Sequence, residues 1–287
     1  MSRREHYRDL YEGPVRDGRP LAVVHGNCQA EALRVLLAGS PGFPWQAVRV
    51  PPVHELEAGD LAAYDRLLAA STLLVSQPVA HGYRDLPLGT AQVSARLAPG
   101  AVVVVWPVVR WQGLHPWQAI VRAADGAEPP VVPYHDLRTL TGRVPHDADL
   151  VAAARDSTAE LVRREATCDV VVSDLLAGAD AVHTLNHPGN RVLIELARRV
   201  QSHVGAPADA ADPGRVLLGG VRAPLEPGVL EALGLDAAPQ EHWLVAGRHV
   251  SPGEVVAAQS AWYATRPDVV TEGMRRYAGR LPVLGLA

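Results

Sequence analysis

The sequence has few cysteines and no long apolar run. Its 287 residues include only Cys28 and Cys168, too few for a disulfide framework or a zinc finger, and a reducing compartment would keep both as thiols. No segment has the roughly 18 uninterrupted apolar residues of a membrane span. The arginines Arg3 and Arg4 near the start are not followed by the apolar stretch of a signal peptide. We therefore expect a soluble, cytoplasmic protein.

An excess of positive charge is also missing. All 27 basic residues are arginine, 31 residues are acidic, and the formal net charge is -4. This balance argues against binding to nucleic acid, although it is compatible with one basic pocket for a phosphorylated ligand. The sequence also lacks metal-ligand spacings and glycine-rich phosphate loops, which disfavours dehydrogenases, kinases and metallohydrolases.

The sequence does contain 48% hydrophobic residues, enough for a large core, and one distinctive stretch near its start. Residues 21–29 form an apolar run that breaks at Gly26, and the apolar residues that follow recur at helical spacing. We expect a strand, a turn and then a helix with Asn27 as its N-cap. Cys28 would lie in the first helical turn, where free backbone N–H groups and the helix dipole lower the pKa of a thiol and can hold an oxyanion.

Apolar strands alternate with helical patterns through the first 106 residues. We expect further strands at 46–50, 72–76 and 101–106, and helices at 56–68 and 90–97. This alternation indicates an α/β fold, a parallel sheet flanked by helices in three layers. Ligands of such sheets bind beyond the carboxyl ends of the strands, so residues 25–29, 76–78 and 106–116 should line one crevice.

The segment 106–116 is rich in aromatic residues. Trp106, Trp111 and His115 lie in it, and Trp117 follows directly. Such a rim could stack on a sugar or a nucleotide, or its tryptophans could seal the loop onto the core, and the sequence favours neither interpretation.

Residues 147–176 are expected to be mostly helical. A spacing of seven places Leu161, Cys168 and Leu175 on one helix face. Cys168 is therefore expected to be a structural thiol without a catalytic role.

Two histidines, His183 and His187, precede an amphipathic helix. Because proline favours the first helical position, Pro188 should place His187 at the N-cap. Two histidines four residues apart bind zinc well when both lie on one continuous helix. Here the helix begins only after the second histidine, so a metal site is disfavoured. A helix N-terminus disfavours the cationic imidazole, so His187 is expected to be neutral and suited to act as a general base.

The chain becomes rich in proline and glycine beyond about residue 205. We expect a hairpin at 242–250 and a helix at 252–265. The proposed organisation is an α/β catalytic core over 1–205 and an extension over 206–287 that packs on it as a helical cap, within one structural domain. Arg215 and Arg222 are candidates for contacts with cofactor phosphates, although surface arginines are usually solvated.

Cys28 and His187 together supply the parts of a nucleophile and base pair, if the fold brings them within hydrogen-bond reach. Taken singly, Cys28 could be a small buried hydrophobe and His187 a helix cap.

Four short motifs, in this order, resemble the motif series of the WcbI family, which is named for capsular polysaccharide biosynthesis. They are His25-Gly26-Asn27-Cys28-Gln29, Ser76-Gln77-Pro78, Gly113-Leu114-His115-Pro116 and Thr184-Leu185-Asn186-His187-Pro188. The Gly-Asn-Cys-Gln and Asn-His-Pro elements are the specific ones, and a weaker similarity at Trp262-Tyr263 and Arg266-Pro267 extends the resemblance over nearly the whole chain. The layout is also similar to that of SGNH (GDSL-type) hydrolases, with a cysteine in place of the serine nucleophile.

The resemblance implies a coenzyme A-binding acyltransferase that acetylates a hydroxyl of a sugar or polysaccharide precursor. Acetyl-CoA would be a co-substrate, with no tightly bound cofactor. Cys28 would be the nucleophile, His187 the base and Asp180 the orienting acid. In SGNH hydrolases the orienting acid usually lies three residues before the histidine. Asp180 has this spacing from His183 and a longer one from His187, so His183 is an alternative base. The residues implied in oxyanion or substrate binding are His25, Asn27, Gln29, Gln77, Trp111, His115, His183 and Asn186.

Several functions stay open. Cys28 could carry the acyl group, or His187 could activate the acceptor directly while Cys28 shapes the pocket. An esterase or thioesterase would use the same residues with water as the acceptor. A non-catalytic protein that binds coenzyme A or another ligand would leave Cys28 unreactive.

Overall fold

The structure is a computed structural model that describes residues 2–287, and the chain divides into two compact units. Unit 1 comprises Met1–Val108, Val162–Leu176 and Gly189–Leu218, and unit 2 comprises Val109–Leu161, Ala177–Pro188 and Gly219–Ala287. The sequence analysis instead expected two continuous segments, residues 1–205 and 206–287, and that division stays a prediction.

Unit 1 contains a parallel sheet of four strands in the order β2-β1-β3-β4, which confirms the expected α/β fold. Its strands are β1 (Leu21–His25), β2 (Gln46–Val48), β3 (Ser71–Ser76) and β4 (Val102–Val105). Its helices are α1 (Arg3–His6), α2 (Arg8–Glu12), α3 (Cys28–Gly39), α4 (Leu61–Ala69), α5 (Thr90–Ser94) and α8 (Asn190–His203).

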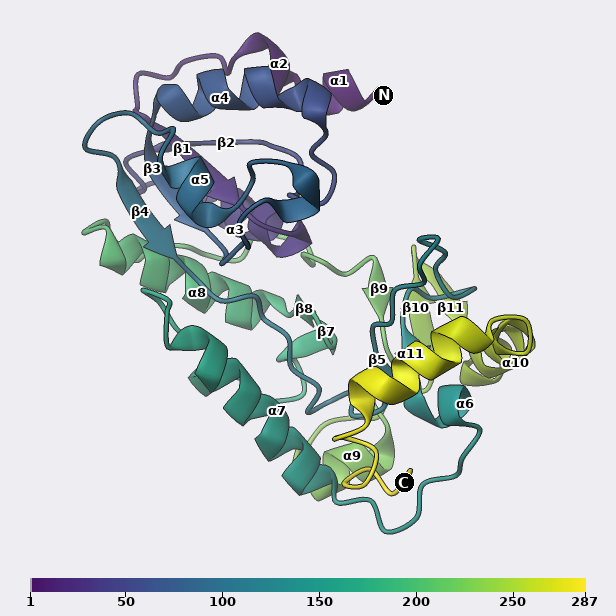
Figure 1. The fold of residues 1–287 in the computed structure, drawn as a ribbon. Coiled ribbons are helices and arrows are strands. Elements are labelled where there is room, and N and C mark those ends of the chain that lie inside the picture. The colour runs from purple at the N-terminus through teal and green to yellow at the C-terminus, as the bar shows by residue number, and fades with distance from the viewer. Residues whose placement is uncertain (1) are drawn as a thin grey trace. The chain divides into compact units, whose positions relative to one another are not determined.

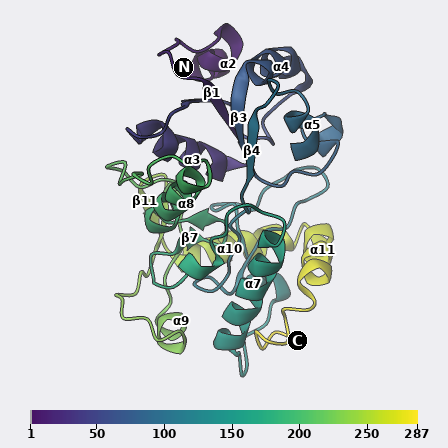
Figure 2. The same cartoon turned by 90° about the vertical axis from the view of Figure 1, so that its left-hand side faces the viewer.

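Helices cover both faces of this sheet (Figures 1 and 2). α3 packs against β1, β2 and α8 on one face, whereas α2, α4 and α5 share a core with β1 and β3 on the other. Successive side chains of a strand point to opposite faces, and all five residues of β1 are buried. Burial on both faces explains why this strand reads as an unbroken apolar run.

The register of the sheet brings two of the predicted ligand-binding segments together. His25 at the end of β1 is paired with Ser76 at the end of β3. The residues that follow, Gly26 and Gln77, therefore leave the sheet side by side at its carboxyl edge, as the parallel arrangement predicts.

The helix predicted over 147–176 is shorter in the structure, where α7 spans Leu150–Glu165. The chain turns because the buried carboxylate of Glu165 accepts hydrogen bonds from the backbone N–H groups of Val172 (2.5 Å) and Ser173 (2.9 Å). Cys168 lies beyond the helix end, so its predicted place on a helix face is wrong. Burial raises the pKa of this thiol to about 11, which keeps it protonated at neutral pH.

Unit 2 is built from short strands and helices around two small apolar cores. Its strands are β5 (Gln118–Ala119), β6 (His135–Asp136), β7 (Val182–Thr184), β8 (His187–Pro188), β9 (Val221–Arg222), β10 (Trp243–Val245) and β11 (Arg248–Val250). Besides most of α7, its helices are α6 (Leu137–Thr141), α9 (Pro227–Ala232), α10 (Pro252–Tyr263) and α11 (Pro267–Tyr277). The predicted hairpin is confirmed, because β10 and β11 pair antiparallel around Ala246 and Gly247, both with positive φ. The predicted helix that follows it is α10.

The predicted N-cap position of His187 is wrong. His187 and Pro188 form β8, which pairs antiparallel with β7, so the backbone stays extended through the proline. α8 begins only at Asn190, with Gly189 as its N-cap.

Candidate active site

Cys28 is the first residue of α3, as predicted, and a network of amides builds the turn that carries it. The side chain of Asn27 caps the helix by accepting from the backbone N–H of Gln29 at 2.9 Å. Gln77 lies across the turn, where its Oε1 accepts from the backbone N–H of Asn27 (2.8 Å) and its Nε2 donates to Oε1 of Gln29 (3.1 Å). A Cβ at Gly26 would lie 2.8 Å from Cδ of Gln77, so only glycine admits this approach. Direct contacts of these amides with an oxyanion stay predictions.

The expected lowering of the Cys28 pKa is wrong in its net direction. Burial of the thiol raises its pKa and outweighs the backbone N–H groups of Cys28 and Gln29, which lower it as predicted for a helix start. The negative charge of Glu55 raises the pKa further. Cys28 is therefore a protonated thiol at neutral pH.

His25, predicted to bind substrate, is buried at the end of β1 with both ring nitrogens engaged. Its Nε2 donates to the carbonyl of Leu88 (2.9 Å), because a carbonyl only accepts, and its Nδ1 therefore accepts from the hydroxyl of Tyr64 (2.8 Å). Burial lowers the pKa of His25 to about 4. These contacts tie the end of β1 to α4 and to the segment before α5, which is a positioning role.

The two candidate bases, His183 and His187, lie close together on the β7–β8 hairpin of unit 2, where His187 pairs with Thr184. Burial lowers the pKa of both His183 and His187 to about 4, and the positive charge of Arg222 contributes at His183. Both imidazoles are therefore neutral at pH 7. The neutral state expected for a general base is present, although burial produces it rather than a helix N-terminus.

Different groups face the two imidazoles. At His183 the negative charge of Asp180 partly offsets the lowering of the pKa by burial. At His187 a hydrogen bond with the carbonyl of Val221 partly offsets it. A carbonyl that accepts from one ring nitrogen leaves the other as the proton acceptor. Within unit 2, Asp180 is thus associated with His183, and a backbone carbonyl takes the corresponding place at His187.

Tyr134 also belongs to this group, and the sequence analysis missed it. Its hydroxyl donates to Oδ1 of Asn186 (2.8 Å) and accepts from Oγ1 of Thr184 (2.9 Å). The same hydroxyl lies 3.5 Å from Nδ1 of His187, and the two rings meet edge to face. Nothing in the sequence marks Tyr134, because it lies 52 residues before Asn186 and joins it only through folding.

The aromatic loop is turned inward. Trp106, Trp111 and Trp117 are all buried, and the indole N–H of Trp111 donates to Oγ1 of Thr158 at 2.9 Å. The Trp111 ring also lies against Gly113, where a Cβ would collide with it. These contacts match the interpretation in which the tryptophans seal the loop, so a contact of Trp111 with substrate stays a prediction.

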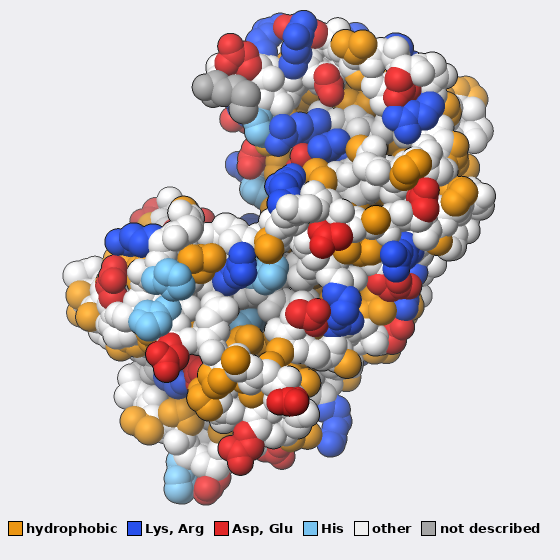
Figure 3. Space-filling model, turned by 180° about the vertical axis from the view of Figure 1, so that it is seen from behind, with side chains coloured by type: hydrophobic (Ala, Val, Ile, Leu, Met, Phe, Trp, Pro, Cys, Tyr) orange, Lys and Arg blue, Asp and Glu red, His pale blue; other side chains and the backbone are white. Residues whose placement is uncertain are grey.

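The two candidate phosphate-binding arginines differ in their surroundings. Arg222 lies on β9, half-buried and close enough to His183 to affect its pKa. Arg215 is exposed in unit 1, and its backbone carbonyl accepts from the side chain of Asn190. Arginines and carboxylates are interspersed over the surface in Figure 3, so exposure alone does not distinguish Arg215 as a phosphate ligand.

The structure therefore brings the predicted residues together in two groups. Asn27, Cys28, Gln29 and Gln77 meet in unit 1, and a second group meets in unit 2. That second group contains His183, Asn186 and His187, with Arg222 and Asp180 beside His183. Cys28 and His187 belong to different units, and their catalytic pairing stays a prediction.

The family model described as "Polysaccharide biosynthesis enzyme WcbI" matches residues 21–209. The chain belongs to the WcbI family. The matched part starts at β1 and contains Cys28, Gln77, His115 and His187. As a WcbI-family protein, the chain is a polysaccharide biosynthesis enzyme.

A solved WcbI structure has the same fold as this WcbI-family chain. The TM-score is 0.78 at 21% identity, over 92% of this chain and 97% of the other. That structure is described as native protein without a disulfide bond between coenzyme A and one of its cysteines. A search of curated proteins found no match.

Membrane-spanning helices and clusters of metal ligands were sought among the described residues. None of the helices within residues 2–287 combines the length and apolar character needed to cross a bilayer. In the same part of the chain, His, Cys, Asp and Glu side chains form no cluster of three or more that could hold a metal ion.

Proposed function

We propose that this WcbI-family protein is a coenzyme A-dependent O-acyltransferase, which transfers an acetyl group to a hydroxyl of a sugar or glycosylated precursor. One observation carries the proposal, which is that Cys28 is the first residue of α3. The solved WcbI structure is described as lacking a disulfide bond between coenzyme A and one of its cysteines. We infer from this that Cys28 lies beside the sulfur of bound coenzyme A, which is the atom that carries the acyl group.

The protonation states support a mechanism that begins with neutral partners. A protonated Cys28 needs a base to become a nucleophile, and a neutral imidazole provides one. His187 is the proposed base, with His183 as the alternative because Asp180 is associated with it.

In the covalent version, the proton of the Cys28 thiol passes to the imidazole while the sulfur bonds to the acyl carbon. Coenzyme A leaves as a thiol after taking that proton. The acceptor hydroxyl then gives its proton to the imidazole, its oxygen bonds to the acyl carbon, and the Cys28 sulfur leaves and is reprotonated. Backbone N–H groups at the start of α3 are candidates to stabilise the negative oxygen of each intermediate.

In the direct version, the imidazole takes the proton of the acceptor hydroxyl while its oxygen bonds to the acyl carbon of bound acyl-CoA. Coenzyme A then leaves as a thiol after taking that proton, and Cys28 only shapes the site. The raised pKa of Cys28 is the observation that favours this version.

Intact mass spectrometry after exposure to acetyl-CoA distinguishes the two versions. The covalent version predicts an acetyl increment on the wild type and on the matched control Cys168→Ala, but not on Cys28→Ala. It also predicts that Cys28→Ala lowers turnover on the order of 10³-fold or more. Nearly intact turnover in Cys28→Ala would establish the direct version, whereas no increment, no copurified coenzyme A and no turnover would contradict the proposal.

The thioesterase alternative is separated by omitting the acceptor. An acyltransferase releases free coenzyme A slowly from acetyl-CoA until an acceptor is added. Rapid thiol release in water alone would identify hydrolysis as the reaction.

A further inference from the structure

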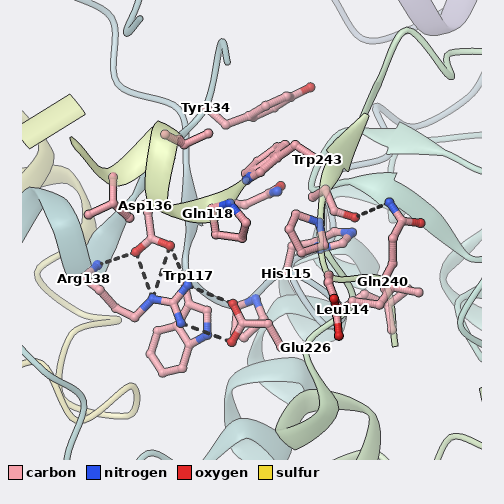
Figure 4. Close-up of a pocket in the computed structure, with 18 of the residues that line it drawn as sticks. Leu114, His115, Trp117, Gln118, Tyr134, Asp136, Arg138, Glu226, Gln240 and Trp243 are labelled. Carbon is pink, nitrogen blue, oxygen red and sulfur yellow. Dashed lines mark hydrogen bonds and ion pairs between the residues drawn. The ribbon is translucent and has the colours of Figure 1, made fainter. Parts of the chain in front are cut away.

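Unit 2 contains a cavity of about 480 Å³, and neither His183 nor His187 is among the residues that line it. Its walls come from residues 114–118, from 134–138, from 223–227, from 239–243 and from α10 (Figure 4). This volume is typical of a site for a small molecule.

Flat aromatic rings form part of the walls. Trp243 stacks on Tyr134 with the ring planes inclined by 17°, and Trp117 lies under the guanidinium of Arg138 at 4.8 Å from the ring centroid. The negative face of an aromatic ring attracts the weakly positive C–H hydrogens that line one face of a pyranose. These walls therefore suit a sugar ring.

One buried nitrogen atom of the lining lacks a partner. Nε1 of Trp117 donates no hydrogen bond within residues 2–287, although this residue is only 7% exposed. Buried polar groups are normally paired. A ligand hydroxyl oxygen accepts hydrogen bonds, so it could satisfy this indole N–H.

The charge of the lining is negative overall. The lining contains three carboxylates, those of Asp136, Glu226 and Glu241, and one guanidinium, that of Arg138. Arg138 is already engaged, at 2.6 Å from Asp136 and 2.8 Å from Glu226. The histidines of the lining are neutral because burial lowers their pKa. This environment repels the phosphates of coenzyme A or of a nucleotide sugar and admits a neutral polyol.

We propose that this cavity binds a neutral pyranose ring of the acceptor saccharide. Its role as the acceptor site rests on the proposed acyl transfer, whereas saccharide binding does not. Tyr134 links the two features within unit 2, because its ring lines the cavity and its hydroxyl bonds to Asn186 beside His187.

A valine on α10 allows a test that leaves the core intact. Val256 lines the cavity but is 44% exposed, so Val256→Trp should fill the cavity without removing buried contacts. Val151→Trp is the matched control, because Val151 is also 44% exposed on a helix and does not line the cavity.

Binding to the full-length protein is measured by saturation-transfer NMR with the methyl glycosides of glucose, galactose and mannose. We expect at least one to bind the wild type and Val151→Trp equally and to bind Val256→Trp at least tenfold more weakly. Methyl glucuronide, which carries a negative charge, should bind the wild type more weakly than methyl glucoside.

Several results would overturn the proposal. The wild type could bind none of the glycosides, or Val256→Trp could bind them as tightly as the wild type does. Val256→Trp, but not Val151→Trp, could also lose binding to coenzyme A. Glycoside binding that Val256→Trp abolishes, in a protein without any acyl transfer, would keep the saccharide site and refute the proposed reaction instead.

Discussion

The turn that carries Cys28 depends on the absence of a side chain at Gly26, and Gly26→Ala tests this directly. The φ angle of Gly26 is not in the left-handed region, so the backbone itself tolerates alanine. The added Cβ would lie 2.8 Å from Cδ of Gln77, closer than real contacts allow, and Gln77 is only 1% exposed. Gln77 must therefore move or the turn must open.

Either response breaks hydrogen bonds that the structure defines. Gln77 would lose its bonds to the backbone N–H of Asn27 and to the side chain of Gln29. Each buried polar group left unpaired costs about 1–3 kcal/mol, so we expect Gly26→Ala to lower the free energy of unfolding by about 2–4 kcal/mol. Turnover should fall as well, because the same turn positions the thiol.

Urea denaturation measures the free energy of unfolding, and a glycine-to-alanine substitution at the end of α3 supplies the control. Gly39 ends that helix and a Cβ there meets nothing within 4 Å, so Gly39→Ala should be neutral or stabilising by up to about 1 kcal/mol. In Gln77→Ala the obstructing side chain is gone, so adding Gly26→Ala should cost little more. A Gly26→Ala variant as stable as Gly39→Ala, or a double variant with additive losses, would refute the reasoning.

Three further predictions concern the candidate active site. Since the pKa of His187 is about 4, the neutral base should persist well below pH 6.5. We therefore expect kcat/KM to stay level from pH 7 to about 5 and to fall only toward pH 4. Half-maximal activity near pH 6.5, with the fold intact by circular dichroism, would contradict this. Because the charge of Glu55 raises the pKa of Cys28, Glu55→Gln should speed alkylation of Cys28 by iodoacetamide at pH 8 in a Cys168→Ser background, and an unchanged rate would show that burial alone sets the pKa. Tyr134→Phe removes the hydroxyl that bonds Asn186 and Thr184, so it should lower kcat about tenfold or more with little change in the KM for acetyl-CoA, and equal changes in both constants would argue against a positioning role.

Local patterns predicted the elements that depend on neighbouring residues. The strand, glycine turn and capped helix over residues 21–29, and the hairpin before α10, follow from apolar spacing, from a capping asparagine and from turn residues that accept a positive φ. The same patterns failed at Cys168, because α7 ends at Glu165, whose buried carboxylate bonds to the backbone of residues seven and eight positions further on. They failed again at Pro188, where strand pairing replaced a helix start.

The sequence by itself determined the α/β class, the position of Cys28 at a helix start and the motifs that assign the family, because each is written in residues that are adjacent or periodically spaced. Only the tertiary structure decided the protonation of Cys28, since burial by many distant groups outweighs the local helix effect. Only folding, too, brought Tyr134 to the β7–β8 hairpin and enclosed the cavity beside it. Such contacts join residues that are 50 or more positions apart, and no spacing along the chain encodes them.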